Sequence, residues 1–290
     1  MNVRIEQQNP DICKNVTSVE SLSGVRFVET ARNVKTHLEK MHLRLISDVV
    51  LGEKILRDGT FLSQGQFIIS TANHNSKSGE FGKCVIYDKC GKYLRTISTL
   101  SSPFGILHDV SDIKIVFPSK KYMQAVSSHS IFSVGSKPIK LPNEPYCITR
   151  LFHYLYVACN DKIIKINNFG RQSATFDTGP SVKHVTSTSS NIIYSNRKTN
   201  EVVAIDCQGT TVWRYSSPGL LSSCGLSVDG DDNIYVAGKE SENIHVLTKD
   251  GRCVRVFEDI TRPDFMKVDK ERKMCVVGSM RKYVKVYEML

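Results

Sequence analysis

The sequence lacks the features of a membrane, secreted or zinc-binding protein. The chain of 290 residues has no apolar run near the roughly 20 residues that a membrane span needs. Its first eight residues, 1–8, are too polar for a signal peptide. The 9 cysteines include no Cys-x-x-Cys pair, so a ring-type zinc domain is not expected. We therefore expect a cytoplasmic protein with buried, reduced thiols and no membrane partner.

Recognisable catalytic motifs are also missing. The chain has neither a Gly-x-Ser-x-Gly elbow nor a glycine-rich phosphate loop. His108, His153, His184 and His245 are spread along the sequence, and nothing directs them toward a common point. The expected inner strands offer no recurring inward carboxylate that could hold calcium or zinc. The sequence therefore predicts no cofactor, no metal ligand and no catalytic residue, and a chain that is not an enzyme.

Residues 224–257 show most clearly what the sequence does contain. They hold four short runs rich in Val, Ile, Leu, Tyr and Phe, each bounded by Gly, Asp or Asn. Asp229-Gly230 and Asp250-Gly251 are hairpin signals, because glycine supplies the positive φ that a tight turn needs. This stretch predicts one four-stranded antiparallel unit.

The same unit recurs along the chain. Strand runs end in glycine turns at Gly91, Gly170, Gly209 and Gly251, with separations of 79, 39 and 42 residues. The first separation is about twice the others, so one repeat without a glycine turn lies between Gly91 and Gly170. A period near 40 residues with four strands in each unit is typical of a β-propeller.

Six blade cores follow from this period, and the fold class expected is an all-β, six-bladed β-propeller of four-stranded antiparallel blades. The cores are expected at residues 61–71, 104–117, 146–159, 184–195, 225–237 and 265–277. The sixth blade lacks one strand before the chain ends. Residues 42–50 have no blade of their own, so we expect them to supply that strand and close the ring.

Residues 1–41 are expected to form a separate lead-in, with the propeller at residues 42–290. Apolar residues within 27–41 follow at spacings of four and three, which is typical of a helix and of the end of a coiled coil. Residues 25–28 also fit a short strand, and this alternative stays open. Self-association is expected only if the lead-in continues a coiled coil.

Three motifs of residues 224–257 carry a resemblance to a known family. The runs Gly225-Leu-Ser-Val-Asp, Asn233-Ile-Tyr-Val-Ala and Asn243-Ile-His-Val-Leu, followed by Asp250-Gly251, resemble the NHL repeat. Residues 42–290 resemble the C-terminal six-bladed propeller of tripartite-motif (TRIM-like) proteins of a divergent invertebrate type. The resemblance implies a propeller that selects a protein or RNA target for a ring-type ubiquitin ligase, whose catalytic module this chain lacks.

The sequence departs from the family at one recurring position. The family often has an aspartate directly after the Val-Ala of the second strand. The corresponding residues here are Ser70, Pro118, Cys159, Ser195, Gly238 and Gly278.

The formal net charge of +10 is expected to be concentrated on one face, where the loops between second and third strands emerge. Tyr122, Tyr283 and His74 lie on or beside these loops, where they could stack on unpaired bases. The predicted partner-binding residues are Lys77, Lys120, Lys121, Tyr122, Arg197, Lys198, Arg281, Lys282 and Tyr283.

The function expected from these observations is a non-catalytic recognition module, the substrate-recognition part of a tripartite-motif-type protein. A protein or acidic peptide is the first partner expected, and single-stranded RNA is the second. The alternatives left open are a metal-dependent hydrolase of the gluconolactonase-like six-bladed type and a ring-less scaffold. The single tryptophan, Trp213, is expected to fill space between neighbouring blades.

Overall fold

The structure is a computed structural model that describes residues 38–51, 54–73, 82–99, 101–109, 112–127, 137–269, 273–280 and 282–290. The chain divides into two units, Met1–Lys40 and Met41–Leu290. Most of the predicted lead-in lies outside the described residues, including the first part of its helical stripe. Residues 38–40 are helical. No helix of the described residues is long and apolar enough to cross a membrane.

The described residues of the second unit form 23 β-strands in five antiparallel sheets. Sheet I contains β2 (Lys54–Phe61), β3 (Phe67–Asn73), β4 (Lys83–Tyr87) and β5 (Tyr93–Ser98). Sheet II contains β6 (Ile106–Asp109), β7 (Asp112–Phe117), β8 (Tyr122–Ser127) and β9 (Ile139–Lys140). Two short 3-10 helices, η2 (Ser63–Gly65) and η4 (Pro118–Lys120), lie in turns of these sheets.

The remaining strands form three more sheets. Sheet III contains β10 (Cys147–Leu151), β11 (Tyr154–Ala158), β12 (Asn160–Ile166), β13 (Gln172–Ser187), β14 (Ile192–Asn196), β15 (Glu201–Ile205) and β16 (Thr211–Ser216). Sheet IV contains β17 (Ser223–Val228), β18 (Ile234–Gly238), β19 (Asn243–Leu247) and β20 (Cys253–Phe257). Sheet V contains β21 (Pro263–Asp269), β22 (Met274–Ser279), β23 (Tyr283–Met289) and β1 (Leu43–Val50).

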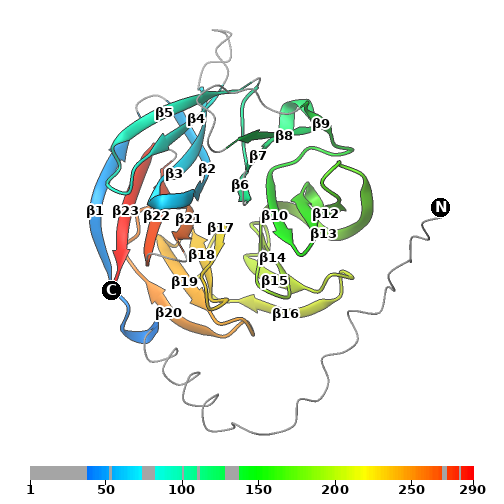
Figure 1. Ribbon diagram of the computed structural model, residues 1–290. Coiled ribbons are helices and arrows are strands. Elements are labelled where there is room, and N and C mark those ends of the chain that lie inside the picture. The colour runs from blue at the N-terminus through cyan, green and yellow to red at the C-terminus, as the bar shows by residue number, and fades with distance from the viewer. Residues whose placement is uncertain are drawn as a thin grey trace, which may run out of the picture. The chain divides into compact units, whose positions relative to one another are not determined.

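The five sheets follow one another around a ring (Figure 1). Buried apolar clusters pack sheet V against sheet I, sheet I against sheet II, sheet II against sheet III, and sheet III against sheet IV. Strands β17 and β18 contact β21, which joins sheet IV to sheet V. The apolar residues of the strands therefore hold neighbouring sheets together. The all-β propeller fold expected from the sequence is confirmed.

The prediction of six separate blades is wrong for the described residues. They show four separate four-stranded blades, which are sheets I, II, IV and V, and one seven-stranded sheet. The reason is the 16-residue strand β13, which pairs with β12 through its first half and with β14 through its second. Gly179 and Ser181, each with φ of 75°, bend this strand without ending it.

The predicted closing strand is confirmed. Strand β1 pairs with β23 in antiparallel register, from Leu43 opposite Met289 to Val50 opposite Tyr283. Hydrogen bonds between His42 and Leu290 extend the pairing by one residue, with N to O distances of 2.7 and 2.9 Å. The last strand of this unit thus has a partner on both sides, and the first described strand completes sheet V as its fourth strand.

The cysteine prediction holds for most of the described cysteines. All eight are free, and Cys84, Cys147, Cys159, Cys224 and Cys275 are buried. Burial raises the pKa of the Cys147 thiol to about 11 and that of Cys159 to about 12, so both are protonated at neutral pH. The other three described cysteines are exposed or half-buried.

The glycine turns that revealed the repeat also join neighbouring sheets. Gly251 has φ of 82° and donates its N–H to the carbonyl of Thr248 at 2.9 Å. A Cβ atom on Gly251 would lie 2.7 Å from Cδ2 of Trp213. Trp213, on β16 of sheet III, donates its indole N–H to the carbonyl of Lys249 in sheet IV at 3.0 Å. The expectation that Trp213 fills space between neighbouring sheets is confirmed.

We expect Gly251→Ala to lower the free energy of unfolding by roughly 1–3 kcal/mol, because the new Cβ both strains the left-handed backbone and meets the Trp213 ring. Gly219→Ala is the matched control, since a Cβ there has no neighbour nearer than 3.7 Å. Urea unfolding followed by circular dichroism measures both. Equal stability of the two variants would contradict the proposed contact.

Candidate functional site

The innermost strands of the ring carry the residues that line two cavities. The N-terminal parts of β2, β17 and β21, the second half of β13 and the C-terminal ends of β14 and β18 surround a cavity of about 220 Å³, here called the basic mouth. The C-terminal ends of the inner strands surround a second cavity of about 620 Å³, here called the large cavity. The two cavities therefore lie toward opposite ends of the inner strands.

Two cations of the basic mouth lie against aromatic rings. The Arg57 guanidinium, on β2, is 5.4 Å from the centre of the Phe104 ring. The Lys183 ammonium, on β13, is 4.7 Å from the centre of the Tyr146 ring. The two rings meet edge to face with centres 5.4 Å apart. Cation–π contacts of this kind hold both charges in place without neutralising them.

Two further cations come from the turns that follow β14 and β18. Lys239 forms an ion pair with Asp264, and their side chains are 8% and 13% exposed. Arg197 donates from Nε to the Ser222 hydroxyl at 2.6 Å, and its Nη2 lies 3.5 Å from Glu240. The lining of the basic mouth thus contains four cationic side chains and one carboxylate, Asp264. Such an excess gives the mouth a positive potential.

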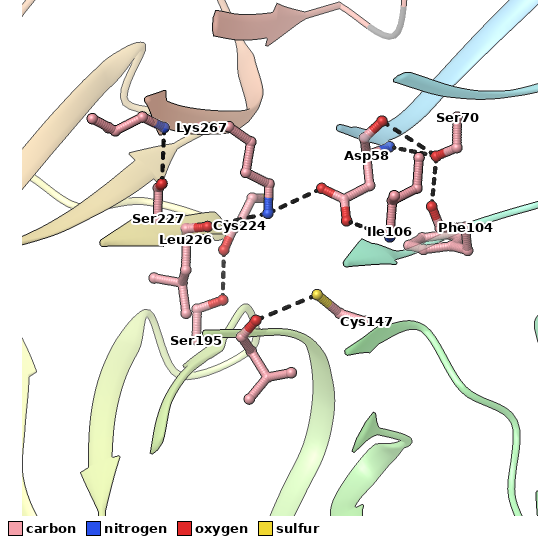
Figure 2. Close-up of polar contacts among 12 residues, drawn as sticks. Asp58, Ser70, Phe104, Ile106, Cys147, Ser195, Cys224, Leu226, Ser227 and Lys267 are labelled. Atoms are coloured by element: carbon pink, nitrogen blue, oxygen red, sulfur yellow. Dashed lines mark hydrogen bonds and ion pairs between the residues drawn. The ribbon is translucent and has the colours of Figure 1, made fainter. Parts of the chain in front are cut away.

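A buried ion pair lies deeper in the channel (Figure 2). The Asp58 side chain, 1% exposed, has Oδ1 at 3.2 Å from the Lys267 ammonium. Its Oδ2 accepts the backbone N–H of Ile106 at 3.2 Å, and Lys267 also donates to the carbonyl of Leu226 at 3.3 Å. Burial alone lowers the pKa of Lys267, but the Asp58 carboxylate outweighs it, and the pKa is raised.

His184 lies beside this pair and lines the basic mouth. Burial lowers its pKa to about 4, and Lys267 and Lys183 also disfavour a further positive charge, while Asp58 and Asp264 oppose the shift. The imidazole is therefore neutral at neutral pH. Its ring nitrogens remain suited to hydrogen bonding rather than to charge pairing.

The lining of the large cavity is electrically balanced. Asp109 accepts from Arg150 at 2.5 Å and from Lys114 at 3.0 Å. Burial raises the pKa of Asp109, but the two cations together lower it by more than burial raises it. The pKa of Asp109 is therefore below its usual value. Lys267 and Arg150 are matched in the lining by Asp109 and Asp232. Of the two cavities, the basic mouth carries the surplus of positive charge.

The residues predicted from the sequence are only partly brought together. Arg197 lines the basic mouth, and the exposed Lys198 follows it in the same turn. Lys120 and Lys121 are exposed at the end of η4 and do not line the basic mouth, and Lys282 is exposed before β23. Lys77 and Arg281, with His74, lie outside the described residues.

The two predicted tyrosines are half-buried at strand starts. Tyr122 begins β8, and its ring lies 5.3 Å from that of Phe117 in the apolar cluster between sheets I and II. Tyr283 begins β23 and pairs with Val50 and Ser279. Their placement assigns both a role in strand pairing and packing, and base stacking by them stays a prediction.

The sequence interpretation missed residues of the inner strands. The first blade core was expected at 61–71, but its inner strand β2 spans Lys54–Phe61, so Arg57 and Asp58 were overlooked. Asp58-Gly59 has the composition of a turn, yet it lies within the strand. The sequence analysis considered only a recurring inward carboxylate and so did not anticipate two single ones, Asp58 in the channel and Asp264 in the lining of the basic mouth. The sequence signal that could have identified Asp58 and Asp264 is a charged residue within an otherwise apolar strand.

A metal-binding cluster is not evident in the described part of the chain. No group of three or more His, Cys, Asp or Glu side chains is arranged there to hold a metal ion. His245, for example, accepts a hydrogen bond from Tyr215 at 2.7 Å and has Nε2 at 3.2 Å from the Gly219 carbonyl. Both of its nitrogens are thus engaged within the fold.

Replacing Lys267 by Met should lower the free energy of unfolding at neutral pH by about 3–5 kcal/mol, because it leaves the Asp58 carboxylate buried without its cation. Adding Asp58→Asn to that variant should restore part of the loss. Urea unfolding of the two single variants and the double variant measures the coupling. If the loss of stability in the double variant equalled the sum of the losses in the two single variants, the proposed coupling between Asp58 and Lys267 would be contradicted.

Acid should weaken the fold through His184. Its pKa falls from 6.5 in the unfolded chain to about 4 in the fold, so the unfolded state binds more protons between these values. The free energy of unfolding should therefore decrease as pH falls from 6.5 to 4, and His184→Gln should reduce this slope. NMR titration of the imidazole checks the pKa. His153→Gln, which replaces an exposed histidine by the same residue, is the control.

No protein-family model matches the chain, and no curated protein matches it. Solved structures do. A catalytically inactive histidine-to-alanine variant of virginiamycin B lyase from Staphylococcus aureus, with quinupristin, has a TM-score of 0.63 at 13% identity, covering 87% of this chain and 100% of that chain. A streptogramin B lyase structure has a TM-score of 0.61 at 13% identity, covering 86% and 88%. Selenomethionine-substituted virginiamycin B lyase from Staphylococcus aureus has a TM-score of 0.60 at 12% identity, covering 87% and 100%.

These comparisons correct the prediction that the chain is not an enzyme. The similar propellers are lyases, so the absence of a familiar catalytic motif from a propeller sequence does not argue against catalysis. At this identity the likeness shows the fold alone and transfers no reaction. The second unit of the chain is a β-propeller.

Proposed function

We propose that the basic mouth binds an acidic segment of a partner protein. The observation that carries the proposal is the convergence of Arg57, Lys183, Arg197 and Lys239 on one cavity of about 220 Å³, with Asp264 as the single lining carboxylate. These cations come from sheets I, III and IV, so the ring itself brings them together. Rigid strands hold them at set distances, which lowers the ordering cost of binding.

The composition of the mouth favours a carboxylate side chain as the inserted group. Lys239 is paired with Asp264 and Arg197 with Glu240, while Arg57 and Lys183 hold their charges against aromatic rings. A cavity of about 220 Å³ has room for one or two side chains rather than a folded element. The exposed Lys198 beside Arg197 extends the positive surface along a peptide.

The resemblance to tripartite-motif propellers agrees with a target-selecting role. We infer that the seven-stranded sheet III corresponds to two blades that share β13, which would give six packing units. The support is a buried cluster that packs β10–β12 against β13–β15, just as other clusters pack separate sheets. A propeller of this kind would place its target at one end of the central channel.

Single-stranded RNA is the other ligand that the mouth's chemistry allows. Cations next to the half-buried rings of Phe104 and Tyr146 resemble the combination that binds unpaired bases. The four-cation mouth is narrow, however, and its rings already contact cations of the protein. An acidic peptide therefore fits better, and RNA is an outcome that the test distinguishes.

The test compares two charge-matched double variants by fluorescence anisotropy. A labelled peptide of alternating glutamate and aspartate should bind the unaltered chain, and Lys183→Ala with Arg197→Ala should weaken it at least about tenfold, which is about 1.4 kcal/mol. Lys120→Ala with Lys121→Ala removes the same charge outside the basic mouth and should leave the affinity within about twofold. Added salt should weaken the peptide complex.

The outcomes separate the alternatives. Equal losses in the two double variants would overturn the proposal, because they would show attraction to total charge and not to the mouth. Tighter binding of labelled oligouridine than of the peptide would also overturn it in favour of RNA. No binding of the peptide at low salt would overturn it outright.

A further inference from the structure

The large cavity has the size and lining of a small-molecule site. Its volume is about 620 Å³, within the range of about 300–1,000 Å³ that is usual for ligand pockets. Thr60 and Thr186 contribute hydroxyls from inner strands, Lys267 lies in its wall, and Arg150 and Phe152 come from the end of β10 and the turn after it. It lies at the opposite ends of the inner strands from the basic mouth, so it is a separate site.

The charges of this cavity are already paired within the protein. Arg150 and Lys114 hold Asp109, and Asp58 holds Lys267. The Asp232 carboxylate accepts the N–H and hydroxyl of Ser189 at 2.8 and 2.5 Å. A charged ligand would have to compete with these internal partners, so the balance favours a neutral ligand.

Two hydroxyl groups of the cavity nevertheless remain available. Arg150 donates from Nη2 to Asp109 and Asn168, and its Nε is buried too deeply to reach a ligand in the cavity. The hydroxyls of Thr60 and Thr186, both half-buried, make no hydrogen bond to any described residue. Each hydroxyl can both donate and accept, so the pair favours a ligand that carries hydroxyl groups of its own.

An exposed aromatic ring stands at the rim of the cavity. Phe152 is 61% exposed, although a phenyl ring gains free energy by leaving water. Its backbone has φ of 54°, a left-handed conformation that is uncommon for a bulky residue. The turn between β10 and β11 thus holds an apolar surface next to the polar groups of the cavity.

We propose that the large cavity binds a neutral, polyhydroxylated small molecule such as a sugar. The ligand hydroxyls exchange hydrogen bonds with Thr60 and Thr186. Its apolar C–H face packs against the Phe152 ring. This combination of hydroxyl-binding groups with one apolar face matches the two surfaces of a pyranose. The proposal does not depend on the function proposed for the basic mouth.

The experiment uses the purified full chain and four sugars that share a pyranose ring and differ in charge. Glucose and N-acetylglucosamine are the neutral probes, glucuronate is the anionic probe and glucosamine is the cationic probe. Saturation-transfer NMR detects binding, and calorimetry gives the affinity. We expect a neutral probe to bind more tightly than either charged probe.

Single substitutions in the lining of the large cavity test where the sugar binds. Phe152→Ala and the isosteric Thr186→Val should each weaken the neutral sugar by about tenfold, the loss expected from one good contact or hydrogen bond. Phe169→Ala is the control, because Phe169 is 86% exposed and does not line the cavity. Lys183→Ala with Arg197→Ala should also leave sugar binding unchanged, which separates this site from the basic mouth. Circular dichroism confirms that each variant is folded.

Each result decides the proposal. Neutral binding that is lost in Phe152→Ala and Thr186→Val and kept in Phe169→Ala supports it. It is overturned if neither neutral sugar binds, or if glucuronate or glucosamine binds as tightly as the neutral probes. Equal affinity in Thr186→Val and the unaltered chain would overturn the assigned location.

Discussion

The ion pair between Asp58 and Lys267 is the constraint on which the centre of the propeller depends. It joins β2 of sheet I to β21 of sheet V, and its remaining hydrogen bonds reach Ile106 on β6 and Leu226 on β17. Strands of four sheets therefore meet at one pair of charges (Figure 2). Because both groups are largely shielded from water, neither can lose its partner cheaply. The positions of the inner strands, and hence of both cavities, follow from this contact.

Other links between adjacent sheets are made by small residues, serine or glycine, at the position that follows the apolar run of the second strand in each repeat. The Ser70 hydroxyl donates to the carbonyl of Phe104 at 2.5 Å, and Ser195 donates to that of Cys224 at 2.6 Å. At the equivalent Gly278, on β22 of sheet V, a Cβ would lie 2.6 Å from Cδ2 of Leu56, on β2 of sheet I. Where the family resemblance would place an aspartate, this chain thus joins its sheets by a serine hydrogen bond in some places and by close packing in another.

The parts of the fold that could be predicted are those encoded locally. Glycine turns such as the one at Gly251 repeat at a regular interval because each needs a positive φ, and the missing strand of the last sheet identified β1 as its donor. The continuous strand β13 could not be predicted, because Gly179 looks like a break when its neighbours are unknown. The basic mouth was only partly predictable. Arg197 lies in a predicted loop, but Arg57 joins it only through closure of the ring.

The two ends of the channel differ in charge because of where the internal carboxylates lie. In the lining of the large cavity, Asp109 and Asp232 equal the cations Arg150 and Lys267 in number, whereas the lining of the basic mouth has four cations and the one carboxylate of Asp264. Between the two ends, the paired Asp58 and Lys267 add no net charge, and the neutral His184 adds none at neutral pH. The potential of each end is therefore set by its own lining, since a compensated pair has little field at a distance. One ring of strands can in this way present two surfaces of different chemistry, one suited to anions and one to neutral polar molecules.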